Sequence, residues 1–73
     1  MFETVKKILE DELQIDPDTI SLYSELSADL GINSIELANL VMLCEDKFDI
    51  TIEDEDIHRF ITVGDVVEFL ESR

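Results

Sequence analysis

The chain has 73 residues, of which 45% are hydrophobic, so there is room for one small domain with a single core and none for a second domain. Nineteen acidic residues face five basic ones, and the formal net charge is −14. Such a surface disfavours nucleic acids and anionic membranes as partners, because their phosphate groups would be repelled. It favours basic patches on other proteins, although acidity also keeps a small protein in solution.

Redox and targeting features indicate a cytoplasmic protein. The single cysteine, Cys44, has no partner within the chain for a disulfide, which fits a reducing compartment. The N-terminal residues mix polar and apolar side chains, unlike a signal peptide, and no apolar run approaches the ~20 residues needed to span a bilayer. Because the chain starts at Met1 and ends soon after the last predicted helix, we expect a free-standing protein. We also expect a monomer.

The first predicted helix and a long connector occupy the N-terminal half. Apolar residues at helical spacing predict a helix over residues 2–14, and Pro17 within "DPD" marks its end. Residues 16–33 then form a connector that is rich in apolar side chains. We expect this connector to pack onto the core, because loops of such length in small domains are uncommon and often functional.

Three more helices are predicted in the C-terminal half. One covers residues 34–48, a short one begins at the acidic run 53–56, and the last follows Thr62 and ends at about residue 72. Only residues 48–52 resemble a strand, and that strand would have no partner. The prediction is an all-α fold: a small four-helix bundle with a long first connector and a short third helix, in one domain over residues 1–73.

The helix predicted over residues 34–48 carries two apolar stripes. At 100° per residue, the core face consists of Leu37, Leu40, Val41, Cys44 and Phe48. The second stripe consists of Ile35, Ala38 and Met42, and it is flanked by Asn39, Glu45 and Asp46. This second stripe indicates a partner-binding surface, or else a central helix that is buried on several sides. Leu43 lies opposite the core face, where we expect it to contact the third helix or the connector.

Few side chains in this sequence support catalysis. Cys44 falls on the core face and is expected to act as a small hydrophobic residue. His58, the only histidine, is expected at the surface, and a triad that joins it to Ser34 would require a coincidence of folding. The calcium-loop pattern fails when it starts from Asp29 or from Asp49, because Ser34 and Asp54 then occupy its glycine position. We therefore predict no metal site and no enzymatic activity.

Ser34 occupies a distinctive position at the start of the second helix. It follows a glycine turn in "DLGINSIEL", and Asn33 can cap the helix in a capping box with Glu36. With a cap already supplied by Asn33, the hydroxyl of Ser34 is available for another role. The first turn of a helix also favours negative charge there, through free N–H groups and the helix dipole.

The stretch "DLGINSIELANLVMLCEDKFDI", followed by "ITVGDVVEFL", resembles the acyl carrier protein family over essentially the whole chain. The resemblance implies that a phosphopantetheinyl transferase esterifies Ser34 with 4'-phosphopantetheine from coenzyme A, using a divalent metal. The arm would hold acyl groups as thioesters, so the chain itself needs no catalytic residue. Its partners would be this transferase and acyl-loading and chain-extending enzymes with basic patches.

The resemblance also assigns roles to residues of the second and third helices. The acidic recognition residues would be Glu36, Glu45 and Asp46. The apolar contact stripe would be Ile35, Ala38 and Met42, and the lining of an acyl pocket would be Leu40, Cys44, Ile57 and Phe60. On this interpretation, Met42→Glu or Glu45→Lys should weaken use by partner enzymes and leave the fold intact.

Some positions depart from the family pattern and leave the cargo open. Asn33 replaces the usual aspartate, which favours a transferase other than that of fatty-acid synthesis, and Asn39 and Leu43 point to a specialised carrier. Fatty-acid, polyketide, related lipid and aminoacyl or peptidyl cargoes are alternatives.

Outside the carrier family, one alternative is a non-covalent acidic adaptor that docks basic partners through the second helix. The substitution Ser34→Ala would not change the binding of such an adaptor. A hydrolase that uses Ser34, His58 and an acid is the remote third alternative.

Overall fold

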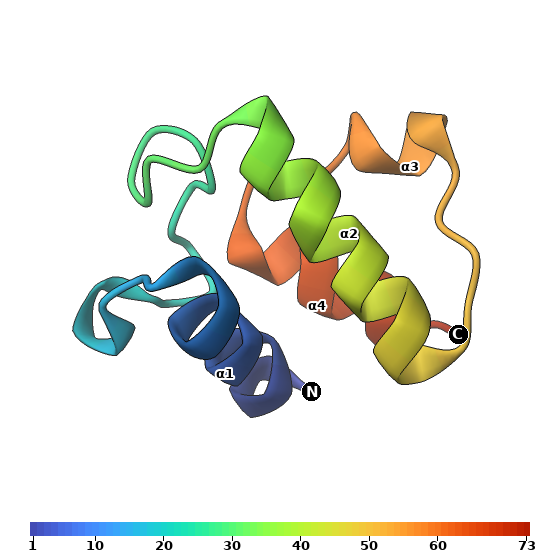
Figure 1. Ribbon diagram of the computed structural model, residues 1–73, viewed down its shortest axis with the longest axis horizontal. Helices are drawn as coiled ribbons and strands as arrows, with labels where there is room; N and C mark the ends of the chain where they lie inside the picture. The colour runs from blue at the N-terminus through green and yellow to red at the C-terminus, as the bar shows by residue number, and fades with distance from the viewer.

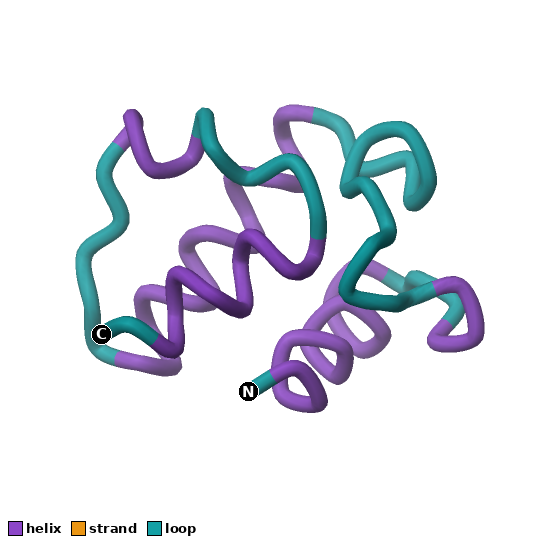
Figure 2. Tube along the Cα trace, turned by 180° about the vertical axis from the view of Figure 1, so that it is seen from behind, coloured by secondary structure: helices purple, strands orange, loops and turns teal.

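A computed structural model describes residues 1–73 and is made of helices and loops (Figures 1 and 2). The elements, in chain order, are α1 (Phe2–Leu13), the 3-10 helix η1 (Pro17–Thr19), α2 (Ser34–Phe48), α3 (Asp54–Ile57) and α4 (Val63–Glu71). The only β-type pairing is one isolated antiparallel bridge between Glu25 and Thr62. The all-α prediction is therefore confirmed, and η1 is an addition that the sequence analysis did not anticipate.

One hydrophobic cluster joins the helices and the connector. Its members come from α1, α2 and α4, from the connector and from the segments on either side of α3: Val5, Ile8, Leu9, Ile20, Leu26, Ile32, Leu40, Val41, Cys44, Ile52, Phe60, Val63, Val66, Val67 and Leu70. Three of them, Ile20, Leu26 and Ile32, lie between η1 and α2, so the expectation that the connector packs onto the core is confirmed. Burial of these side chains is the main stabilising contribution in so small a chain.

Backbone hydrogen bonds attach the connector to the segment that joins α3 and α4. The N–H of Leu26 donates to the carbonyl of Ile61 at 2.9 Å. The N–H of Gly64 donates to the carbonyl of Leu22, also at 2.9 Å. A Cβ atom at Gly64 would lie only 2.8 Å from the same Leu22 oxygen, so the close approach requires glycine here. These bonds hold the connector in place and thereby fix where α2 begins.

The buried Ser24 satisfies the polar groups inside the connector. Its hydroxyl donates to the carbonyl of Thr19 at 2.8 Å and accepts from the N–H of Ser21 at 3.0 Å. The carbonyl of Ser24 in turn accepts from the N–H of Val63 at 3.0 Å. A buried hydroxyl is tolerated because each of these groups has a partner.

Helix α4 begins with the predicted cap. Thr62 Oγ1 accepts from the N–H of Asp65 at 3.2 Å, and Asp65 Oδ2 accepts from the N–H of Thr62 at 2.9 Å. The same carboxylate oxygen also accepts from the N–H of Ile61 at 3.0 Å. Helices α1 and α2 both end on a residue with left-handed backbone, Gln14 and Asp49.

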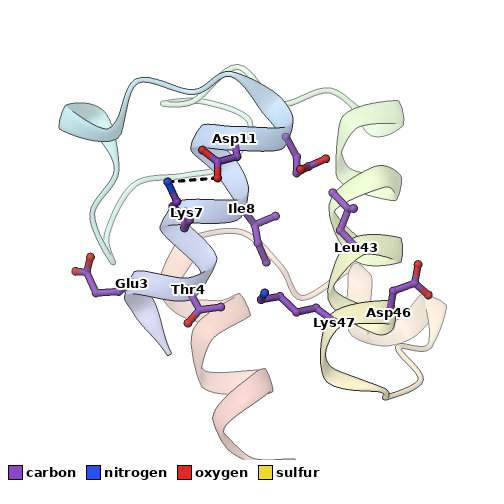
Figure 3. Close-up of a pocket in the computed structure, with 9 residues that line it drawn as sticks. Glu3, Thr4, Lys7, Ile8, Asp11, Leu43, Asp46 and Lys47 are labelled. Atoms are coloured by element: carbon purple, nitrogen blue, oxygen red, sulfur yellow. Dashed lines mark ion pairs between the residues drawn. The ribbon is translucent and has the colours of Figure 1, made fainter.

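The structure places Leu43 beside α1, which was not the expected neighbour. This side chain is half-buried and lies across from Ile8 of α1 (Figure 3). On the helical wheel Leu43 lies about 60° from Leu40, at the edge of the core face of α2, and α1 lies on that side of the helix. Contacts between distant segments are not visible in the periodicity of one helix.

Candidate functional site

Ser34 is the first residue of α2 and is exposed. Just before it, Gly31 turns the chain with a φ of +69°, and buried Ile32 donates its N–H to the carbonyl of Leu26 at 2.9 Å. Asn33 Oδ1 accepts from the N–H of Glu36 at 2.8 Å, and the Glu36 carboxylate accepts from the N–H of Asn33 at 3.2 Å. The predicted capping box is confirmed, and it leaves the Ser34 hydroxyl without a hydrogen-bond partner in the chain.

The backbone around Ser34 is suited to a negatively charged group. In the first turn of α2, the N–H groups of Glu36 and Leu37 are bound by the side chain and the carbonyl of Asn33. Those of Ser34 and Ile35 have no partner within the chain. Free N–H groups and the positive end of the helix dipole favour an anion at this position. A phosphodiester on the Ser34 oxygen therefore fits the residues that surround it.

An apolar hollow of about 420 Å³ lies beside Ser34. Its hydrophobic lining comes from the connector, the start of α2 and the α3–α4 segment: Leu26, Ile32, Leu37, Phe60 and Ile61. Ser27, Glu25 and Asn33 complete the rim. The hydrogen bond between Leu26 and Ile61 brings two of these segments together, so the same bonds that fix the start of α2 also shape this hollow.

The residues expected to line an acyl pocket are partly separated from this hollow. Leu40, Cys44 and Phe60 are buried, and Ile57 is half-buried against the same core. Of the four, only Phe60 lines the hollow beside Ser34, and its ring packs edge-on against Phe69 at a centroid distance of 5.4 Å. The contribution of the connector could not be predicted from the sequence, because no periodic pattern signals which loop residues will meet α2.

The second stripe of α2 is free of contacts that would bury it. Ile35 is 75% exposed, Met42 is 60% exposed, and Ala38 between them is exposed as well. The alternative that α2 is a central helix buried on this side is therefore wrong. Exposed apolar side chains in a row, with acids beside them, have the composition of an interface with another protein.

The three acids near this stripe differ in their burial and in the hydrogen bonds that they make within the chain. Glu45 is half-buried, and its Oε2 accepts from the N–H of Ile52 at 2.8 Å, which holds the segment after α2. Glu36 belongs to the capping box of Asn33. Asp46 is exposed and makes no hydrogen bond or ion pair within the chain. Glu45→Lys would remove a bond that orders the chain, so the expectation that it leaves the fold intact needs correction, and Asp46 is the better position to test.

Cys44 and His58 lie where the sequence analysis placed them. The Cys44 side chain is 1% exposed, and burial, with a smaller contribution from the negative charge of Glu45, raises the pKa of its thiol to about 11. A thiol of this kind is a poor nucleophile near neutral pH. His58 is exposed at the end of α3 and does not line the hollow beside Ser34.

Two further features of the chain concern metals and membranes. No three or more His, Cys, Asp or Glu side chains come together in a way that would hold a metal ion. None of the helices combines the length and the apolar character that crossing a bilayer requires.

Comparisons with known proteins agree with this geometry. Residues 3–70 match a protein-family model described as "Phosphopantetheine attachment site". The acyl carrier protein of Campylobacter lari is 36% identical over 72 residues, which are 99% of this chain and 94% of that protein. The acyl carrier protein of Sulfurovum sp. is 38% identical over 72 residues, with 99% and 96% covered. That of Clostridium perfringens is 40% identical over 70 residues, with 96% and 92% covered.

Proposed function

The chain belongs to the phosphopantetheine-binding acyl carrier proteins, and from this premise we propose that Ser34 is the residue that carries the 4'-phosphopantetheine arm. The protein is a carrier and not an enzyme. The observation that supports Ser34 is its hydroxyl, exposed and unbonded, at the start of a helix with two free N–H groups. When bound, the arm supplies a terminal thiol that holds acyl groups as thioesters.

The residues around Ser34 have positioning roles in this proposal. Asn33 and Glu36 hold the first turn of α2 through their capping box, so the hydroxyl is presented at a fixed place. The N–H groups of Ser34 and Ile35 would bind the phosphodiester oxygens, and the helix dipole would stabilise their charge. None of these residues needs to transfer a proton or act as a nucleophile once the arm is attached.

An apolar cargo would be sheltered by side chains near the start of α2. We retain Leu40, Cys44, Ile57 and Phe60 as the proposed lining. Phe60 connects that set to the hollow beside Ser34, which Leu26, Ile32, Leu37 and Ile61 also line. Burial of hydrocarbon there would stabilise the loaded protein by roughly 0.8 kcal/mol for each methylene group removed from water.

As a member of this family, the chain interacts with a transferase and with biosynthetic enzymes. We propose that these enzymes present basic patches and dock on the stripe formed by Ile35, Ala38 and Met42. The flanking carboxylates of Glu36, Glu45 and Asp46 would attract the basic residues, and Asp46 is the freest of them. We also propose a cytoplasmic location, because a buried free thiol fits a reducing compartment.

The cargo class is proposed more coarsely. Relatives named acyl carrier protein favour an acyl cargo, from fatty-acid, polyketide or related lipid synthesis, over an aminoacyl or peptidyl one. Asn33 stands where the family resemblance implies an aspartate, directly before Ser34, which favours a transferase that does not require that charge.

The test is an intact-mass measurement after incubation with coenzyme A, Mg²⁺ and a promiscuous phosphopantetheinyl transferase. We expect a gain of one phosphopantetheinyl group in the wild-type chain and none in Ser34→Ala. Ser27→Ala is the matched control, because Ser27 is another exposed serine beside the same hollow, and it should be loaded normally. Loading that survives Ser34→Ala would contradict the proposal, and absence of loading in every chain would favour the non-covalent adaptor.

A further inference from the structure

A groove of about 800 Å³ separates α1 from the second half of α2, away from Ser34 (Figure 3). Its floor is apolar: Ile8 of α1 and Leu43 of α2 face each other across it. We propose that this groove is a second docking surface, and that its occupant is a basic amphipathic helix of an enzyme that uses the carrier. The inference rests on the proposed function, because only a carrier has such enzymes as partners.

The charges around the groove favour a basic occupant. Lys7 and Asp11 form an ion pair at 3.4 Å, the only one in the chain, and largely neutralise each other. Glu3, Glu12 and Asp46 also line the groove, and none of these carboxylates has a hydrogen bond or an ion pair within the chain. They outnumber the single unpaired cation, Lys47, so lysines or arginines on an incoming segment would gain local attraction as well as long-range steering.

The groove is continuous with the exposed stripe of α2. A smaller hollow of about 190 Å³ lies between them and is lined by Leu13, Met42, Leu43, Asn39, Glu12 and Asp46. Met42 belongs to the stripe, whereas Leu43, Glu12 and Asp46 belong also to the groove. An enzyme seated on the stripe would therefore meet an apolar path around α2 onto α1, with carboxylates along its edges.

This combination of features matches a helix laid in a groove more closely than a small ligand. An amphipathic helix would place apolar side chains at helical spacing over Ile8, Leu13 and Leu43, and its basic side chains would reach Glu12 and Asp46 at the rim. An acidic or uncharged segment would lack this complementarity. A lipid or nucleic-acid surface would be repelled by the net charge of −14.

Lys47 would oppose the occupant that the carboxylates attract. It has no ion pair, and in Figure 3 its side chain extends from α2 across the groove toward Thr4 and Ile8. A basic helix must displace this ammonium or supply an acid for it. Removal of the Lys47 charge should therefore strengthen binding, whereas reversal of the charge of Glu12 should weaken it.

The probe is a synthetic helical peptide of about 15 residues, with leucines on one face and lysines on the rest, titrated into the ¹⁵N-labelled full chain with and without the arm. We expect chemical-shift changes to concentrate in residues 3–13 and 42–47. Glu12→Lys should raise the Kd about threefold or more, and Lys47→Gln should lower it. Glu71→Lys and Arg59→Gln are the matched controls, since each makes the same change in net charge at an exposed position outside the groove.

Three results would overturn the inference. The first is an equal change in Kd for Glu12→Lys and Glu71→Lys, which would show attraction by net charge alone. The second is a set of shifts confined to α3, α4 or residues 34–41. The third is the absence of peptide binding to the groove in a chain that is loaded at Ser34. The mass gain at Ser34 is measured separately on Glu12→Lys and on the wild type. Loading without groove binding would contradict only this inference, whereas absent loading would contradict the proposed function.

Discussion

The two apolar faces of α2 have nearly the same kind of side chains and opposite surroundings. On the inner face, Leu40 and Cys44 are each 1% exposed and are covered by the rest of the chain. On the outer face, Ile35 and Met42 project from the surface, and Asp46 lines a shallow hollow together with Met42. The inner face therefore contributes to folding, whereas the outer face is available to another molecule. Hydrophobicity alone does not distinguish the two roles.

The largest effect should come from truncation of the inner face. Leu40→Ala would leave a cavity in the core and should lower the free energy of unfolding by about 2–5 kcal/mol. A domain of this size often has only ~3–5 kcal/mol of net stability, so much of the variant would be unfolded. Met42→Ala should change stability by less than about 0.5 kcal/mol. Urea denaturation of the two variants measures the difference in stability. Equal losses of stability would contradict the assignment of the two faces to different roles.

Gly64→Ala tests whether the close contact between the connector and the start of α4 stabilises the fold. The new Cβ would lie 2.8 Å from the Leu22 oxygen, so one of the two segments must move, at a cost of about 1–3 kcal/mol. Gly31→Ala is the matched change, because its Cβ would meet nothing within 4 Å and only the φ of +69° opposes it, at about 1 kcal/mol. Thermal denaturation of both variants checks the order, and a harmless Gly64→Ala would contradict the account of the connector.

The Cys44 thiol makes the inner face sensitive to alkaline pH. Burial raises its pKa from the usual value near 9 to about 11 in the folded chain. The neutral thiol therefore contributes its full stabilisation of the folded chain below about pH 9. This contribution to the free energy of unfolding is lost as the pH rises through 11. Between about pH 8 and pH 10.5 the loss should be about 1–2 kcal/mol.

Cys44→Ala is the control for this titration, since tyrosine and lysine also titrate at high pH. The variant will be less stable at every pH because it leaves a cavity, but it should lose less stability than the wild type between the two pH values. Urea denaturation at both pH values gives the comparison. Parallel losses in the two chains would show that the thiol of Cys44 does not experience the burial described here.

A modest effect on stability is predicted for the cap that holds Ser34. Asn33→Ala removes the acceptor for the N–H of Glu36 and should cost about 1 kcal/mol. Asn33→Asp keeps an equivalent cap and adds a negative charge beside Ser34, so stability should be retained and loading by a transferase with a basic patch should become faster. Thermal denaturation and loading rates separate the two effects. Slower loading of Asn33→Asp would contradict the role given to charge at this position.

The sequence was sufficient to predict features that depend on nearby residues. Pro17, the cap at Asn33 and the cap at Thr62 are short-range signals, and the helices begin and end close to the predicted residues. The same signals placed Ser34 at the start of α2. The angular separation of Ile35 and Met42 from the core face left two alternatives, an exposed stripe or a helix buried on several sides, and their exposure in the structure supports the first.

Features that depend on distant segments were not accessible from the sequence. The packing of Leu43 against α1 depends on the angle between two helices, which periodicity does not give. The bond from Ile52 to Glu45 gives a presumed recognition residue a structural role. The meeting of Leu26 with Ile61, which shapes the hollow beside Ser34, depends on how the connector folds back onto the α3–α4 segment.

The central claim is that the outer face of α2 serves partner enzymes and not the fold. The most direct test is kcat/KM for loading of Ser34 by the phosphopantetheinyl transferase, measured for the wild type and for Met42→Glu, with the melting temperature of each. We predict about a tenfold or larger fall in kcat/KM with a nearly unchanged melting temperature, because a carboxylate would replace an apolar contact at an exposed site. An unchanged kcat/KM, or a fall in the melting temperature that accounts for the lost loading, would contradict this claim.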